Sequence, residues 1–114
     1  MAYYGQNACS AWVRFKGTGT VTIDNDYNVS SVTDHATGDY SINFSSALAN
    51  INYSVGGFAH RNGSTGGRVI CHIDLINNQS TSYYRFNVSG TTNAQIVGLS
   101  NVDTDRIYLQ FFNG

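Results

Sequence analysis

Residues 11–21 of this chain read AWVRFKGTGTV, and this stretch decides the fold class. Side chains alternate within it, so that Val13 and Phe15 share one face of an extended segment. Trp12 and Arg14 share the opposite face. A period of two is typical of a β-strand. Gly-Thr-Gly then supplies turn-forming residues before the alternation resumes, which predicts a β-hairpin.

The same glycines raise the alternative of a phosphate-binding loop. A dinucleotide-binding fingerprint that starts at Gly17 requires glycine at positions 17, 19 and 22, followed by a helix. Position 22 is Thr22, a strand pattern follows it, and the chain contains no Gly-Lys-Ser or Gly-Lys-Thr. The hairpin is therefore the interpretation that fits the residues.

Strand patterns and turn signals follow one another along the remaining chain. Alternation occurs at 21–23, 40–44, 51–55, 69–75, 84–88 and 107–111, with weaker runs at 27–33 and 94–99. Turn residues occur at 17–19, 37–39, 77–78 and 90–92, and a glycine-rich stretch at 56–68 is predicted to be a long loop. About eight short strands with this spacing predict an all-β, antiparallel β-sandwich. We expect one domain at 11–114, preceded by an N-terminal arm at 1–10.

Composition narrows the class of protein further. Charged residues make up 11% of the chain, against about 25% in an average globular domain. The chain has no Glu and a single Lys, so long exposed helices are not expected. The net charge is −1 and the six cations are scattered along the sequence. Nucleic-acid binding requires a basic stripe, so no nucleic-acid partner is predicted.

The sequence also carries expectations about location and redox state. The first ten residues contain neither a cationic segment nor an apolar segment of the kind found in a signal peptide. No apolar run approaches 18 residues, so membrane insertion is not predicted. Cys9 and Cys71 lie far apart in the sequence, and free thiols are the default expectation.

Candidates for metal binding and catalysis are weak. Three pairs have suitable ligand chemistry, namely Asp24 with Asp26, Asp103 with Asp105, and His72 with Asp74. Solvated turn carboxylates explain the aspartate pairs, and two ligands are too few for a site within one chain. No Gly-x-Ser-x-Gly elbow accompanies the serines and histidines. We therefore expect no metal, no cofactor and no enzymatic activity.

Candidates for binding lie in the long loop predicted at 56–68. The loop combines an aromatic ring with cations and an amide, which are suited to recognising an anionic glycan. The candidate receptor-binding residues are Phe58, His60, Arg61, Asn62 and Arg68. A mobile linker without a ligand is the competing interpretation.

The last predicted strand is apolar on both faces. Ile107, Leu109 and Phe111 alternate with Tyr108, Gln110 and Phe112. One face of a monomeric sandwich normally faces water. The excess of apolar side chains therefore predicts a homo-oligomer.

A run of motifs in the first half of the chain resembles a known family. Residues 9–21 resemble the C-x-A-W-V-x-F-x-G-T-G-T-V opening of a small domain found in bacteriophage tail fibres and related virion proteins. The resemblance continues through 27–34, 37–44 and 52–57, and weakly in the terminal apolar strand that ends at Gly114. It covers roughly the first half of the sequence and does not extend through the region from Phe58 onward.

The resemblance implies a trimeric module on the virion surface, assembled in the host cytoplasm, that takes part in attachment to the bacterial host. It supplies no catalytic residues, and Trp12 is expected to be a packing or subunit-interface residue. Carriers of the domain often join it to a long fibre, whereas here Met1 precedes the motif by only a few residues. Tyr3 and Tyr4 are therefore candidate residues of an arm that attaches to other virion proteins.

The function expected from sequence is thus binding of a bacterial cell-surface glycan by a tail-fibre-like protein. Several copies held close together would make weak individual contacts effective. Two alternatives remain, a structural protein that decorates a capsid or adapts a tail, and a carbohydrate-binding module that is not viral.

Overall fold

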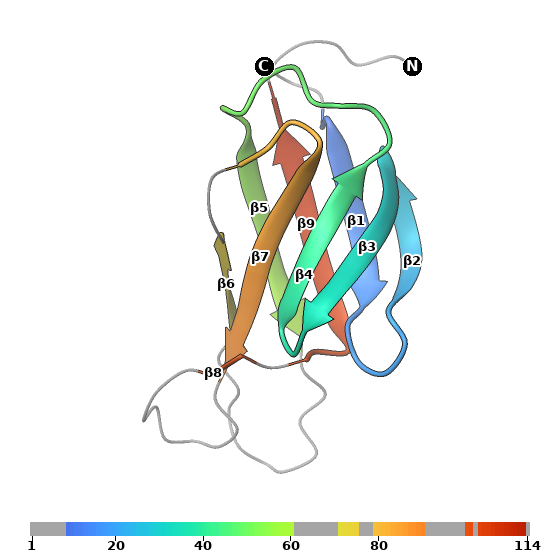
Figure 1. Ribbon diagram of the computed structural model, residues 1–114, viewed down its shortest axis with the longest axis vertical. Helices are drawn as coiled ribbons and strands as arrows, with labels where there is room; N and C mark the ends of the chain where they lie inside the picture. Colours follow the sequence, from blue (N-terminus) through green and yellow to red (C-terminus); the bar gives the residue numbers. More distant parts are fainter. Residues whose placement is uncertain (1–8, 61–70, 76–78, 91–99, 102, 114) are drawn as a thin grey trace.

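The chain folds into two antiparallel β-sheets packed face to face, as the computed structural model shows for residues 9–60, 71–75, 79–90, 100–101 and 103–113 (Figure 1). The strands are β1 (Ala11–Lys16), β2 (Thr22–Tyr27), β3 (Val29–Ala36), β4 (Asp39–Phe44), β5 (Ser54–His60), β6 (Cys71–Leu75), β7 (Tyr83–Gly90), β8 (Ser100–Asn101) and β9 (Arg106–Phe112). One sheet has the order β2-β1-β9-β5, and the other has the order β3-β4-β7-β6 with β8 paired to β7. The prediction of an all-β, antiparallel sandwich is confirmed.

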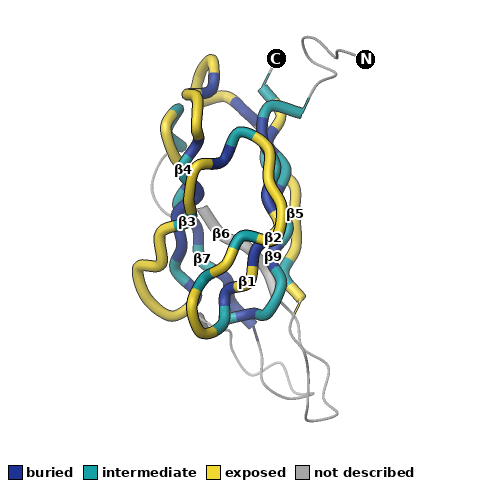
Figure 2. Tube along the Cα trace, turned by 90° about the vertical axis from the view of Figure 1, so that its right-hand side faces the viewer, coloured by how far each residue is buried: buried dark blue, intermediate teal, exposed yellow. Residues whose placement is uncertain are grey.

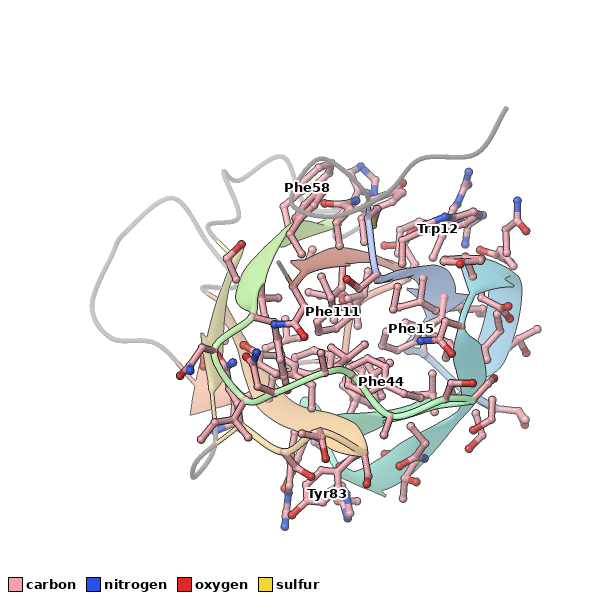
Figure 3. The ribbon with its side chains drawn as sticks, turned by 90° about the horizontal axis from the view of Figure 1, so that it is seen from above. Trp12, Phe15, Phe44, Phe58, Tyr83 and Phe111 are labelled. Atoms are coloured by element: carbon pink, nitrogen blue, oxygen red, sulfur yellow. The ribbon has the colours of Figure 1, made fainter. Side chains whose placement is uncertain are left out.

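The hydrophobic core lies between the two sheets, where inward residues of β1, β4, β7 and β9 are buried (Figure 2). Inward residues of β2 and β5, such as Ile23 and Val55, are partly buried against this core. Phe15, Phe44 and Phe111 point into this space from opposite sheets (Figure 3). The rings of Phe44 and Phe111 meet edge to face, with centroids 5.0 Å apart and an interplanar angle of 83°. Such pairs contribute about 0.5–1.5 kcal/mol beyond the area they bury. The alternation read from sequence therefore identifies core residues of β1, β4, β7 and β9 correctly, whereas in the run at 51–55 it is wrong for Ile51, which is 52% exposed and precedes β5.

The β1–β2 hairpin predicted from residues 11–21 is confirmed. Gly19 adopts a φ of +62°, the left-handed conformation that favours glycine. Gly17 is a glycine for a different reason, because a Cβ there would lie 2.7 Å from the Tyr40 hydroxyl oxygen and 2.8 Å from the Thr104 carbonyl oxygen. The turn therefore packs tightly against β4 and against the segment that leads into β9.

The chain crosses from one sheet to the other at Asn28, between β2 and β3. Asn28 has a φ of +58°, which asparagine tolerates better than most residues. Its side-chain amide donates to the Ser10 and Ser46 carbonyl oxygens at 3.2 and 3.1 Å, and its oxygen accepts the Ser46 N–H at 2.8 Å. The weak strand pattern at 27–33 is thus divided by this corner, and β3 extends to Ala36.

The prediction for the middle of the chain is wrong at one place. Residues 56–60 are not part of a loop but form most of β5, which begins at Ser54 and pairs with β9. The adjacent glycines suggested a loop, yet Gly57 serves close packing of strands. A Cβ on Gly57 would collide with the Tyr108 carbonyl oxygen and lie 2.8 Å from Leu109 Cδ2. Glycine inside a strand often marks such an approach.

Some of the remaining predicted turns and strands fall on described residues, and others do not. The turn before β4 is present, with Gly38 at a φ of +66°. Gly90 ends β7, and the other residues of the turn predicted at 90–92 lie outside the described residues. The predicted turn at 77–78 and the weak strand at 94–99 lie outside the described residues. Across the described part of the chain, no helix has the length and apolar character needed to cross a membrane.

The segment before β1 lies against the last strand. Ser10 N–H donates to the Phe111 carbonyl oxygen at 2.8 Å, and Ser10 Oγ accepts the Asn113 N–H at 3.1 Å. Cys9 carries a free thiol, as the sequence predicted. Tyr3, Tyr4 and the side chain of Cys71 lie outside the described residues, so the predicted attachment arm stays a prediction.

Candidate functional site

The outward side of the β2-β1-β9-β5 sheet carries aromatic and charged side chains, and we call it the outer face. Phe58 and Trp12 lie on this side of the sandwich, away from Phe15 and Phe111 in the core (Figure 3). The register places the outward residues of neighbouring strands side by side, in rows that cross the sheet. Residues distant in sequence therefore meet on one surface.

The central row joins Phe58, Tyr108 and Arg14. Phe58 on β5 pairs with Tyr108 on β9, which pairs in turn with Arg14 on β1. The two ring centroids are 4.7 Å apart, and Arg14 Cζ lies 5.6 Å from the Tyr108 centroid. Phe58 remains 61% exposed. An aromatic pair held by two strands thus presents a ring surface to solvent.

Arg14 in this row and Arg106 on β9 both lie close to one acidic residue, Asp24. A bulge in the β1–β2 pairing gives β2 an extra residue, Asp24, opposite the step from Arg14 to Phe15. Asp24 Oδ2 lies 3.6 Å from Arg14 Nε and 3.9 Å from Arg106 Nε. Exposed pairs of this kind contribute only about 0–1 kcal/mol to stability. Their effect is to compensate much of the positive charge on this part of the outer face.

His60 extends the charged part of the outer face at the end of β5. His60 pairs in register with Arg106, and its Nδ1 lies 3.7 Å from Asp105 Oδ1. The His60 side chain is 61% exposed. The imidazole of His60 thus lies beside the Asp105 carboxylate, on the strand that pairs with Arg106.

A second row contains a polar side chain between aromatic ones. Gln110 on β9 pairs with Trp12 on β1 and with Gly56 on β5, and Trp12 pairs with Tyr27 on β2. Tyr27 is 55% exposed, whereas Trp12 and Gln110 are partly buried. Phe112, two residues beyond Gln110, is 42% exposed. The outer face is therefore amphipathic along its length, which suits recognition of a ligand with polar and apolar sides.

The opposite side of the sandwich has a different character. Tyr83 lies there, outside the β3-β4-β7-β6 sheet (Figure 3). Arg85 donates to both oxygens of Asp39, from Nε at 3.0 Å and from Nη2 at 2.8 Å. These bonds hold the pKa of the Asp39 carboxyl below its usual value, although burial acts in the opposite direction. This surface is dominated by polar groups that satisfy one another.

One pair on that surface has the atoms of a nucleophile and a base. His35 Nε2 lies 2.7 Å from Ser41 Oγ. Catalysis of the serine type also uses a carboxylate that orients the histidine. Asp39 interacts electrostatically with His35. Both of its carboxylate oxygens, however, accept hydrogen bonds from Arg85. The described residues therefore place Ser41 and His35 in a structural hydrogen bond without assembling a triad.

Possible metal ligands are likewise committed to protein partners. Asp24 faces two arginines, and Asp103 Oδ1 accepts from the Gly38 N–H at 2.9 Å. Among the described residues, no three His, Cys, Asp or Glu side chains are grouped to hold a metal ion. β6 is present and pairs His72 with Ser89 and Asp74 with Asn87 along the backbone, but the side chains of β6 are not described.

Two of the five candidate receptor-binding residues lie on this face. Phe58 and His60 lie on the outer face, on a strand and not on the predicted loop. Arg61, Asn62 and Arg68 lie outside the described residues. The sequence places Tyr108 and Gln110 on the second face of the last strand, where it predicts a subunit contact. Their position beside Phe58 depends on the pairing of β9 with β5, which no local pattern reveals.

Comparison of the chain with protein-family models, with curated proteins and with solved structures gives no match. The outer face is therefore interpreted from its own residues and geometry.

Proposed function

We propose that this chain is a tail-fibre-like surface protein of a bacteriophage virion and that its outer face binds a glycan on the bacterial cell. The resemblance of residues 9–57 to virion domains supports the viral part of the proposal. The outer face supports the binding part, because it presents rings and polar groups on a sheet whose opposite side is anchored in the core. Sites on strands hold their side chains more precisely than sites on loops.

The exposed pair of Phe58 and Tyr108 is the observation that carries the proposal. Leaving a phenylalanine ring in water forgoes about 1.5–3 kcal/mol of burial free energy. Phe58 is 61% exposed, whereas Phe44 and Phe111 are buried and pack edge to face in the core. A sugar ring has an apolar side that can cover such a surface while its hydroxyl groups stay hydrated. The ring pair is thus suited to glycan binding.

Multivalency supplies the strength that one such site lacks. A single shallow face makes few contacts, so its affinity for one sugar is expected to be weak. In a homotrimer, three faces are linked, and the second and third contacts form at a high effective concentration. Light scattering coupled to gel filtration tests the assembly, with an expected mass near three times 12.4 kDa.

A structural role on the virion is the second candidate function. Tyr27, Phe58 and Phe112 are all more than 40% exposed, and exposed apolar patches also mark protein–protein contacts. As a capsid decoration or tail adaptor, the chain would bury these rings against another virion protein. Such a protein would not bind bare cells. A non-viral carbohydrate-binding module would instead bind soluble sugar as a monomer.

Adsorption of the purified, fluorescently labelled chain to a panel of bacterial strains tests the proposed function. We expect binding to a subset of strains and its loss in Phe58→Ala. Tyr83→Ala is the matched control, because it removes an exposed ring from the opposite side of the sandwich. Equal adsorption by Phe58→Ala and the unmodified chain would contradict the proposal, and so would adsorption to no strain.

A further inference from the structure

Gln110 occupies the centre of an aromatic frame on the outer face. Tyr108 and Phe112 flank it on the same side of β9, and Trp12 is its cross-strand neighbour on β1. On the other side its neighbour is Gly56, which brings no side chain. A single primary amide thus stands among rings that contribute mainly apolar surface.

Gly56 leaves space beside this amide. The residue is exposed, and the only described atom within 4 Å of a Cβ built there is Gln110 Oε1, at 3.8 Å. Phe58 is the next outward residue on β5, so its ring borders the same space. A larger side chain at Gly56 would fill it. The backbone of β5 at Gly56 is therefore exposed between the Gln110 amide and the Phe58 ring.

The Gln110 amide is available to a ligand. Its side chain has no hydrogen-bond partner among the residues that the structure describes, although the residue is partly buried. A glutamine amide offers one acceptor oxygen and two donor hydrogens. Partial removal from water without a partner is unfavourable, and a ligand that supplies both an acceptor and a donor would satisfy the amide.

Charge on the outer face favours an uncharged ligand. Arg14 and Arg106 both lie near Asp24, and Asp105 precedes Arg106 in the sequence, so two carboxylates offset the two guanidinium charges on this face. Lys16 is four residues along β1 from Trp12, the neighbour of Gln110. At about 3.3 Å per residue that separation is about 13 Å, beyond a Debye length at physiological ionic strength, about 8 Å. An anionic sugar would gain little attraction here.

We propose that the outer face binds a neutral pyranose, with the sugar ring against the Phe58 and Tyr108 rings and a hydroxyl or acetamido group hydrogen-bonded to Gln110. This assignment rests on the proposed glycan-binding function and names its ligand class. It differs from the anionic glycan expected from the sequence, whose candidate cations Arg61 and Arg68 lie outside the described residues. Gln110 is the residue that selects for polar groups on the sugar.

Titration of the full chain by two-dimensional NMR tests this inference. The probes are methyl glycosides of neutral hexoses, of N-acetylhexosamines and of the corresponding uronic acids. We expect a neutral glycoside to shift the Gln110 side-chain amide signals, with an affinity unchanged between 0.05 and about 0.5 M salt. Gln110→Ala and Gly56→Val should each weaken binding about tenfold or more, the loss expected for one hydrogen bond or a filled site. Tyr83→Ala should bind as the unmodified chain does.

Other outcomes separate the ligand class from the proposed function. Tighter binding of uronic acids that weakens with salt, or unchanged binding by Gln110→Ala, would overturn the neutral ligand while Phe58-dependent adsorption to cells could still stand. Absence of binding to every glycoside would also overturn it. Light scattering on the same variants adds a third arm. A fall in mass on Gln110→Ala or Phe58→Ala would show that a second copy of the chain occupies this face, which would overturn both proposals.

Discussion

The Tyr40 hydroxyl oxygen lies 2.6 Å from Asp103 Oδ1 and 2.8 Å from the Gly17 carbonyl oxygen. Asp103 Oδ1 also accepts the Gly38 N–H at 2.9 Å. These contacts connect the β1–β2 turn, the β3–β4 turn and the segment before β9 at one end of the sandwich. Burial raises the pKa of the Tyr40 hydroxyl, and the adjacent Asp103 carboxylate raises it further, so Tyr40 remains a donor at neutral pH.

Tyr40→Phe should therefore destabilise the fold. The variant keeps the ring in the core but removes the donor to Asp103, and hydrogen bonds to charged groups contribute about 1.5–3 kcal/mol. Urea unfolding measures the change in the free energy of unfolding. Tyr83→Phe, at an exposed ring, should change it by less than about 0.5 kcal/mol. Equal stabilities of Tyr40→Phe and Tyr83→Phe would show that the contact with Asp103 contributes nothing.

Asn28 should tolerate glycine better than alanine. Both substitutions remove the side-chain bonds to Ser10 and Ser46, but only alanine must also hold a Cβ at a φ of +58°. A left-handed conformation costs an L-residue about 1–2 kcal/mol. Asn28→Ala should accordingly be less stable than Asn28→Gly by about 1 kcal/mol, measured by urea unfolding. If the two variants unfold at the same denaturant concentration, backbone conformation is not what selects asparagine at this corner.

Alkaline pH should weaken the fold through Tyr53. Burial is the main cause that raises the pKa of Tyr53 from 10.0 to about 12, and the neighbouring Tyr84 raises it further. A raised folded-state pKa means that the unfolded chain releases its proton first. The stabilisation is complete below pH 10 and is lost as the pH rises to about 12.

Thermal unfolding of the chain and of Tyr53→Phe between pH 9 and about 12 measures this loss. Phenylalanine removes the titrating group and also the bond to Ser80, which gives an offset at every pH. The difference in midpoint between the two proteins should therefore shrink as the pH rises. A difference that stays constant across the range would place the alkaline transition on other groups.

Local pattern predicted this fold well because alternation along a strand depends only on neighbouring residues. Val13 and Phe15 are buried as their spacing indicates, while Arg14 between them is exposed. The Gly56-Gly57 pair led to the wrong prediction of a loop, because glycine occurs both in loops and in strands that pack closely against a neighbour. Asp24 reaches the arginines through a bulge, and Tyr108 meets Phe58 through strand pairing. Both relations depend on register across the sheet, which one sequence does not encode locally.

The two faces of β9 should separate stability from binding. Leu109 is 1% exposed in the core, and truncating such a residue to alanine costs about 2–5 kcal/mol. Phe58, packed against the outward neighbour of Leu109, is 61% exposed, so Phe58→Ala should change the free energy of unfolding by less than about 1 kcal/mol. Urea unfolding and cell adsorption, measured on the same preparations, compare the two effects. Leu109→Ala should adsorb normally wherever it remains folded, whereas Phe58→Ala should stay folded and fail to adsorb. A Phe58→Ala protein that loses stability and adsorption in proportion would assign the ring to the fold and not to the ligand.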